Sequence, residues 1–116
     1  MHELGIVFNI IKEVDEIAEK NKVKEVNEVT LEIGEVSGVV PSYLTDCWKW
    51  ACIHRSKYMK ECSLKIITLK AKTFCENCET SYDTKPHGKI CPNCGSNKTY
   101  LLTGRETNIK DIKVTY

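Results

Sequence analysis

Two cysteine pairs decide how this chain is organised: Cys75-Glu76-Asn77-Cys78 and Cys91-Pro92-Asn93-Cys94, separated by twelve residues. A gap of two residues lets both thiolates of a pair reach one ion, and four thiolates at tetrahedral geometry suit zinc. We therefore predict that one Zn²⁺ is bound by the thiolates of Cys75, Cys78, Cys91 and Cys94. An iron site of the rubredoxin type uses the same ligands and stays open as an alternative.

The predicted zinc site is structural rather than catalytic. A catalytic zinc keeps one position open for water and usually has three protein ligands, whereas four cysteines close the shell. Residues 71–98 carry few apolar side chains. Metal binding is therefore expected to supply their folding free energy, on the order of 10 kcal/mol. The sequence thus predicts a zinc-binding domain over residues 71–99 and no enzymatic activity.

A nucleic-acid-binding zinc ribbon is the alternative interpretation of this segment. Residues 71–98 hold four lysines against three acidic residues, and four thiolates with one zinc ion add two negative charges. The metal-bound segment then carries a net charge of about −1, whereas phosphate binding needs clustered Lys and Arg. The aromatic residues Phe74, Tyr82 and Tyr100 are scattered, which is more typical of a small core. A nucleic-acid-binding or protein-interaction module is therefore kept as the second hypothesis.

In the rest of the chain, apolar residues follow two periodic patterns. Apolar residues recur at three- and four-residue spacing where helices are expected and alternate where strands are expected. The predicted elements are helices over residues 4–20 and 42–55 and strands over residues 28–36, 63–70 and 106–115. The predicted fold class is α+β: two helices packed on a small three-stranded sheet, with an inserted zinc-ribbon domain whose ligands are the four paired cysteines. Because the last strand follows the insert, the α/β domain is discontinuous and comprises residues 1–70 plus 100–116.

Length and composition restrict the class of protein. The 116 residues, 41% hydrophobic and 28% charged, make about one globular domain and exclude a multidomain enzyme. The net charge of +1 gives no overall field that would favour nucleic acid or an anionic membrane. The first twelve residues lack the pattern of a signal peptide, and no stretch approaches the roughly 18 apolar residues of a membrane span. We therefore expect a cytoplasmic location, where thiols stay reduced.

The opening residues Met1-His2-Glu3 suggest a second metal site. The α-amino nitrogen of Met1, the backbone nitrogen of His2 and an imidazole nitrogen of His2 can close fused chelate rings around one ion. The amide nitrogen of Glu3 can complete the plane. Nitrogen-rich square-planar coordination is typical of Ni²⁺ or Cu²⁺. A histidine at position 2 also occurs by chance, so this motif alone does not establish a site.

Four segments in this order resemble the HypA/HybF family of hydrogenase nickel-incorporation proteins, over the whole chain. They are Met1-His2-Glu3-Leu4, the stretch Val29-Thr30-Leu31-Glu32-Ile33-Gly34-Glu35-Val36-Ser37-Gly38-Val39-Val40-Pro41, the two cysteine pairs, and Gly104-Arg105-Glu106. The resemblance implies that Ni²⁺ binds the amine of Met1, the side chain and amide of His2 and the amide of Glu3. It also implies structural zinc in the cysteine quartet.

The resemblance further implies a function and a set of partners. It implies a nickel metallochaperone that delivers Ni²⁺ during maturation of [NiFe] hydrogenase. The expected partners are a HypB-type GTPase and the hydrogenase large subunit, with urease maturation proteins as a further option. No nucleic acid or membrane partner is expected.

Two residues depart from the pattern of that family. Gly5 stands where Ser is common, and because Gly is a poorer cap we expect a weaker or shifted start of the first helix. Ser42 stands where an acidic residue often follows the proline. Neither residue supplies a predicted nickel ligand.

The other reactive side chains have simpler interpretations. Cys47 and Cys52 fall on the apolar stripe of the second helix and are expected to be core residues. His54 suits the carboxyl end of that helix as a terminal charge. His87 is interpreted as a loop residue, with a transient nickel contact as the alternative. Trp50 lies off the apolar stripe and is a candidate for a partner surface.

Overall fold

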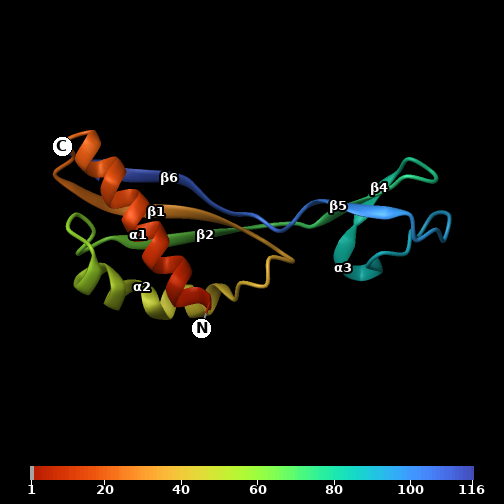
Figure 1. Ribbon diagram of the computed structural model, residues 1–116, viewed down its shortest axis with the longest axis horizontal. Coiled ribbons are helices and arrows are strands. Elements are labelled where there is room, and N and C mark those ends of the chain that lie inside the picture. The colour runs from red at the N-terminus through yellow and green to blue at the C-terminus, as the bar shows by residue number, and fades with distance from the viewer. Residues whose placement is uncertain (1) are drawn as a thin grey trace. The chain divides into compact units, whose positions relative to one another are not determined.

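The computed structural model describes residues 2–116, with side chains from Glu3 onward, and is a mixed α+β fold as predicted (Figure 1). In chain order the elements are α1 (His2–Lys20), β1 (Glu25–Gly34), α2 (Pro41–Arg55), β2 (Ser63–Leu69), β3 (Lys72–Cys75), β4 (Ser81–Asp83), α3 (Thr84–His87), β5 (Thr99–Thr103) and β6 (Thr107–Thr115). All five predicted helices and strands are confirmed, with ends that shift by a few residues. The short elements from β3 to β5 were not predicted individually.

The strands form two separate three-stranded sheets. The larger sheet has the order β2-β1-β6, so the last strand of the chain lies beside the first. The smaller sheet has the order β4-β3-β5, and β3 pairs antiparallel with both neighbours. Because β6 follows the cysteine region in sequence and pairs with β1, the end of the chain completes the larger sheet.

Helix α1 buries one face because its apolar residues recur at three- and four-residue spacing. Its buried apolar residues are Val7, Ile10, Ile11, Val14 and Ala18. Ile17, which falls at the same helical spacing, is instead 41% exposed. α1 packs against α2, and β1 adds core residues of its own, namely Val26, Val29, Leu31 and Ile33. Across residues 2–116, no helix combines the length and the apolar character that a membrane crossing requires.

The start of α1 differs from the prediction. The helix begins at His2, two residues earlier than predicted, so Gly5 lies inside its first turns. Gly5 is therefore not the cap of α1, and the expected weaker or shifted start of the helix stays a prediction.

Helix α2 begins at Pro41, whose fixed φ suits the first helical position and whose missing N–H needs no acceptor there. Its buried residues are Leu44, Trp48, Ala51 and Cys52. The carboxyl end of α2 is fastened to α1 by Asp15, whose carboxylate accepts hydrogen bonds from the Ser56 hydroxyl at 2.7 Å and the Lys57 N–H at 3.0 Å. The position of α2 against α1 is therefore held by polar contacts as well as by apolar packing.

The chain divides into two compact units. The helical unit comprises Met1–Leu31, Val39–Ile67 and Asn108–Tyr116, and the cysteine unit comprises Glu32–Gly38 and Thr68–Thr107. The division predicted from sequence, with boundaries after residues 70 and 99, stays a prediction about independently folding domains.

Within the cysteine unit, residues 34–36 and 104–106 are joined by backbone hydrogen bonds. The N–H of Gly34 donates to the carbonyl of Glu106 at 2.7 Å, and the N–H of Val36 donates to the carbonyl of Gly104 at 2.8 Å. The carboxylate of Glu106 accepts from the N–H of Gly104 at 2.7 Å. A Cβ at position 34 would lie 2.1 Å from the Gly104 carbonyl oxygen, and Gly104 has a φ of 122°. Both glycines are therefore required by this junction.

Candidate metal centres

The structure brings the four predicted zinc ligands into one cluster. Their Sγ atoms all lie within 4.8 Å of one another. The sulfurs of Cys75 and Cys94 are 3.6 Å apart, as are those of Cys78 and Cys91. Four sulfurs at about 2.3 Å from a tetrahedral zinc lie about 3.8 Å from each other. The cluster therefore has the size of a zinc site.

The two cysteine loops share one backbone shape. In each loop the first cysteine donates its N–H to the carbonyl five residues later, Cys75 to Thr80 at 2.8 Å and Cys91 to Ser96 at 3.0 Å. The fourth residue after that cysteine has a left-handed φ in both loops, 57° at Glu79 and 74° at Gly95. The sequence pattern Cys-x2-Cys thus folds twice into the same turn, but only the second turn has the glycine that this conformation favours.

Hydrogen bonds favour the thiolate form of two ligands. The Thr80 hydroxyl lies 3.0 Å from the sulfur of Cys78, and this bond, followed by one from Asn93, lowers the pKa of the Cys78 thiol to about 6. The side-chain amide of Asn77 donates to the sulfur of Cys94 at 3.5 Å and lowers the pKa of that thiol. These neighbours favour the metal-binding thiolate form of Cys78 and Cys94, whereas burial and the adjacent sulfur of Cys94 raise the pKa of the Cys75 thiol to about 11.

Three of the four metal-site cysteines also belong to a small hydrophobic cluster of the cysteine unit. The buried residues of this hydrophobic cluster are Cys75, Tyr82 and Cys91, and Cys78 packs against them partly buried. The Tyr82 hydroxyl donates to the carbonyl of Gly88 at 2.8 Å and so fixes the loop ahead of Cys91. Since three of these four residues are thiol ligands, apolar burial alone stabilises the unit weakly, and a bound ion would supply the missing free energy.

The remaining cysteines lie in the helical unit. Cys52 and Cys62 are buried, whereas Cys47 is half-buried and only partly meets the core expectation. Burial raises the pKa of the Cys52 and Cys62 thiols to about 12. The indole N–H of Trp48 donates to the carbonyl of Cys62 at 3.0 Å. Cys52 and Cys62 are therefore protonated packing residues.

Neither of the histidines with assigned side chains is a member of the cysteine cluster. The ring of His54 contacts the ring of Trp50 at 4.7 Å, and Trp50 is 52% exposed, as expected for a residue off the apolar stripe. His87 is the last residue of the short helix α3, so its interpretation as a loop residue is wrong. Its ring lies 5.9 Å from that of Tyr82. Among the described side chains, the cysteine quartet is the group of three or more that could hold a metal ion.

The predicted nickel ligands are described only in part. Met1 and the side chain of His2 lie outside the described residues, while the backbone of His2 opens α1. The side chain of Glu3 is buried, and its carboxylate accepts a hydrogen bond from the N–H of Val40 at 3.2 Å. Backbone N–H donors, those of Glu3 itself and of Val40, lower the pKa of this carboxyl group. Val40 is the N-cap of α2, so Glu3 ties the starts of the two helices together, a role that the sequence did not reveal.

Relatives of the chain agree on one family. The family profile described as "Hydrogenase/urease nickel incorporation, metallochaperone, hypA" matches residues 1–114. "Hydrogenase maturation factor HypA" of Actinobacillus succinogenes is 34% identical over 114 residues, covering 98% of this chain and 99% of that protein. "Hydrogenase maturation factor HybF" of Klebsiella pneumoniae is 29% identical over 113 residues, covering 97% and 98%.

Two solved structures share the fold. The "Ni metallochaperone HypA from Helicobacter pylori" superposes with a TM-score of 0.73 at 22% identity, covering 97% of each chain. A second solution structure, of "HypA protein", gives a TM-score of 0.75 at 23% identity, covering 98% of this chain and 96% of the other. With the profile match over nearly the whole sequence, these findings confirm the predicted resemblance. The chain belongs to the HypA family of hydrogenase/urease nickel-incorporation metallochaperones.

Proposed function

We propose that this chain binds Ni²⁺ reversibly at its amino terminus and delivers it during maturation of [NiFe] hydrogenase. The proposed ligands are the α-amine of Met1, the amide and imidazole nitrogens of His2, and the amide nitrogen of Glu3. The family assignment supports the nickel cargo. The proposed ligand set rests on the sequence Met1-His2-Glu3 at the start of α1.

The observation that carries the proposal is the way α1 begins. The first N–H groups of a helix have no intrahelical acceptor. The amide nitrogens of His2 and Glu3 can therefore bind a metal without breaking the hydrogen-bond ladder of the helix. The N–H of Val40 holds the Glu3 carboxylate, which anchors the start of α1 to the start of α2. A site at the very start of an anchored helix can capture and release an ion with little change elsewhere.

The second metal of the proposal is a structural zinc bound by Cys75, Cys78, Cys91 and Cys94. Four thiolates leave no open position for water or substrate, so the zinc supplies stability and no reaction is catalysed. We further propose that residues 71–99 fold as the zinc-binding domain, and that residues 1–70 with 100–116 fold as the nickel-binding domain.

The proposed partners follow from the family's role in maturation. They are a HypB-type GTPase, which would act in the transfer of nickel, and the large subunit of [NiFe] hydrogenase, which would receive it. Urease maturation proteins are a further partner class, because the family description covers both enzymes. We propose that the chain acts in the cytoplasm and binds neither nucleic acid nor membrane.

The test compares nickel binding by four zinc-loaded chains in equilibrium dialysis. They are the native chain, His2→Ala, a chain with one residue added before Met1, and the control His54→Ala. We expect His2→Ala to lose the imidazole ligand and the extended chain to lose the terminal amine, so both bind nickel much more weakly. His54→Ala should bind like the native chain, because His54 lies at the end of α2. Equal binding by all four chains would refute the terminal site.

Acid should release the nickel. Amide nitrogens must lose their protons to bind a metal in this way, so affinity falls as pH falls. A titration at about pH 8 and about pH 5.5 checks this, with zinc content measured in parallel. Nickel affinity that stays constant over this range would contradict ligation by the amides.

A further inference from the structure

One residue of the motif Gly104-Arg105-Glu106, namely Arg105, makes none of the hydrogen bonds that hold the junction. Gly104 and Glu106 hold the backbone junction with residues 34–36. The Arg105 side chain between them is exposed and forms no ion pair with any described residue. Both of its neighbours are held by backbone hydrogen bonds, Gly104 to Val36 and Glu106 to Gly34. An unpaired guanidinium on a fixed backbone is suited to bind something outside the chain.

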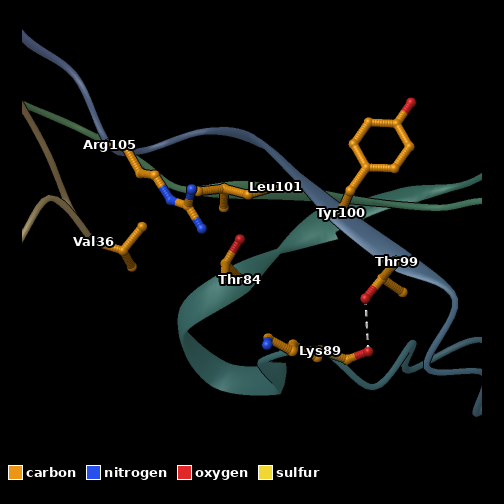
Figure 2. Close-up of a pocket in the computed structure, with 7 residues that line it drawn as sticks. All are labelled: Val36, Thr84, Lys89, Thr99, Tyr100, Leu101 and Arg105. Atoms are coloured by element: carbon orange, nitrogen blue, oxygen red, sulfur yellow. Dashed lines mark hydrogen bonds between the residues drawn. The ribbon is translucent and has the colours of Figure 1, made fainter.

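Arg105 lines a cavity of about 490 Å³ in the cysteine unit (Figure 2). The other lining residues are Val36, Thr84, Lys89, Thr99, Tyr100 and Leu101. Figure 2 shows the guanidinium of Arg105 extending alongside Leu101 on the side of Val36 and Thr84. This volume lies within the range of about 300–1,000 Å³ that is usual for pockets that bind small groups. The lining combines two cations with apolar side chains and contains no acidic residue.

Lys89 is the second cation of the cavity and is also held by its backbone. Its carbonyl accepts a hydrogen bond from the Thr99 hydroxyl at 2.8 Å, drawn in Figure 2. The preceding residue, Gly88, has a φ of 61° and donates its N–H to the carbonyl of Thr84 at 2.6 Å. Like Arg105, Lys89 is exposed and forms no ion pair with a described residue. Lys89 and Arg105 thus each bring one positive charge without an ion-pair partner among the described residues to the same cavity.

We infer that this cavity, defined by Arg105, Lys89, Val36 and Leu101, is a docking site for an acidic side chain of a partner polypeptide. The guanidinium presents a planar pair of donors that matches the two oxygens of a carboxylate, and Lys89 adds a second positive charge. Val36 and Leu101 offer apolar contact to the methylene groups of a Glu side chain or to its neighbours in a peptide. A bare inorganic anion would leave these apolar walls unused. The site does not depend on nickel at the amino terminus.

The folded state of the cysteine loops controls this site. Lys89 lies two residues before Cys91 in the sequence, and its carbonyl is fixed to Thr99 of β5. Loss of the metal from the cysteine cluster would release this loop and separate the two cations. Partner docking is therefore expected only with the zinc-loaded chain.

The test is a titration of the zinc-loaded, full-length chain, followed through its backbone amide signals by NMR. The probe is acetyl-Ala-Leu-Glu-Leu-Ala-amide, the matched neutral probe carries Gln in place of Glu, and inorganic phosphate is the third ligand. We expect the Glu peptide to shift the signals of Lys89, Leu101 and Arg105. Arg105→Gln should weaken its binding about 5-fold and Lys89→Gln about 3-fold, as for partly exposed charge pairs. Lys85→Gln removes the same charge outside the cavity and should bind like the native chain.

Three results would overturn the inference. The first is equal binding of the Gln and Glu peptides, which would show that the carboxylate is not recognised. The second is phosphate binding as tight as that of the Glu peptide, which would show a general anion site. The third is the absence of signal shifts with the Glu peptide while the zinc content stays complete. Unchanged nickel binding by Arg105→Gln keeps this test separate from that of the proposed nickel site.

Discussion

Glu79 occupies a position that favours glycine, and replacing it should strengthen metal binding. Glu79 and Gly95 stand at the same place in two turns of the same shape, both with left-handed φ. A left-handed conformation costs a residue with a Cβ roughly 1–2 kcal/mol. Part of this gain is lost, because glycine has more conformational freedom in the unfolded chain, which costs roughly 0.5–1 kcal/mol on folding. The net gain of Glu79→Gly is therefore about 0.5–1 kcal/mol, or a zinc affinity about 2- to 5-fold tighter, because zinc binding is coupled to folding of the loops.

The assay is competition for zinc against a chromophoric chelator, with two further variants. Gly95→Ala imposes the same penalty on the second turn and should weaken zinc binding about 2- to 5-fold. Glu79→Gln removes the charge near the thiolates but keeps the left-handed penalty, so it separates the electrostatic effect from the backbone effect. The reasoning fails if Glu79→Gln tightens binding as much as Glu79→Gly, or if Glu79→Gly weakens it.

Two further predictions concern packing and thiol chemistry. Gly34→Ala should lower the free energy of unfolding by about 3 kcal/mol, because the new Cβ meets backbone atoms of Gly104 and breaks the junction. Thermal unfolding of zinc-loaded chains measures this loss of stability. Gly5→Ala is the control, since a Cβ at position 5 meets nothing within 4 Å, and it should stabilise α1 by about 0.5–1 kcal/mol. A Gly34→Ala chain that melts at the same temperature as the native chain would contradict the predicted clash. At about pH 7.5 the pKa of about 12 keeps Cys52 and Cys62 protonated, and their thiolate fraction grows only as pH rises toward that value, so in the zinc-loaded chain iodoacetamide should modify Cys47 before Cys52 and Cys62. Peptide mass mapping checks the order of modification, and labelling of Cys52 at the rate of Cys47 would contradict it.

The helices, the strands of the larger sheet and the metal cluster could be predicted because each depends on local spacing. The stripe of α1 has the helical period, β1 and β6 alternate, and Cys-x2-Cys is a local turn. The starts of elements were less accurate. Pro41 marks the first residue of α2, but no comparable residue marks the start of α1 at His2.

The tertiary contacts could not be predicted from the sequence. The hydrogen bond from the N–H of Val40 to the carboxylate of Glu3 joins residues 37 positions apart, and no sequence pattern predicts it. The cavity at Arg105 likewise depends on the junction of residues 34–36 with 104–106 and on the anchoring of Lys89 by Thr99. The sequence did single out Gly104-Arg105-Glu106 by family resemblance. Only the three-dimensional structure separates the two residues that build the junction from the arginine that faces a cavity.

The strand order β2-β1-β6 has a consequence for how the protein is made. During synthesis on the ribosome, β1 and β2 emerge before the cysteine loops, and their third partner β6 emerges after those loops. The cysteine loops are released before it and can capture their ion while the larger sheet still lacks an edge. The larger sheet can therefore gain its third strand only after the cysteine loops have left the ribosome.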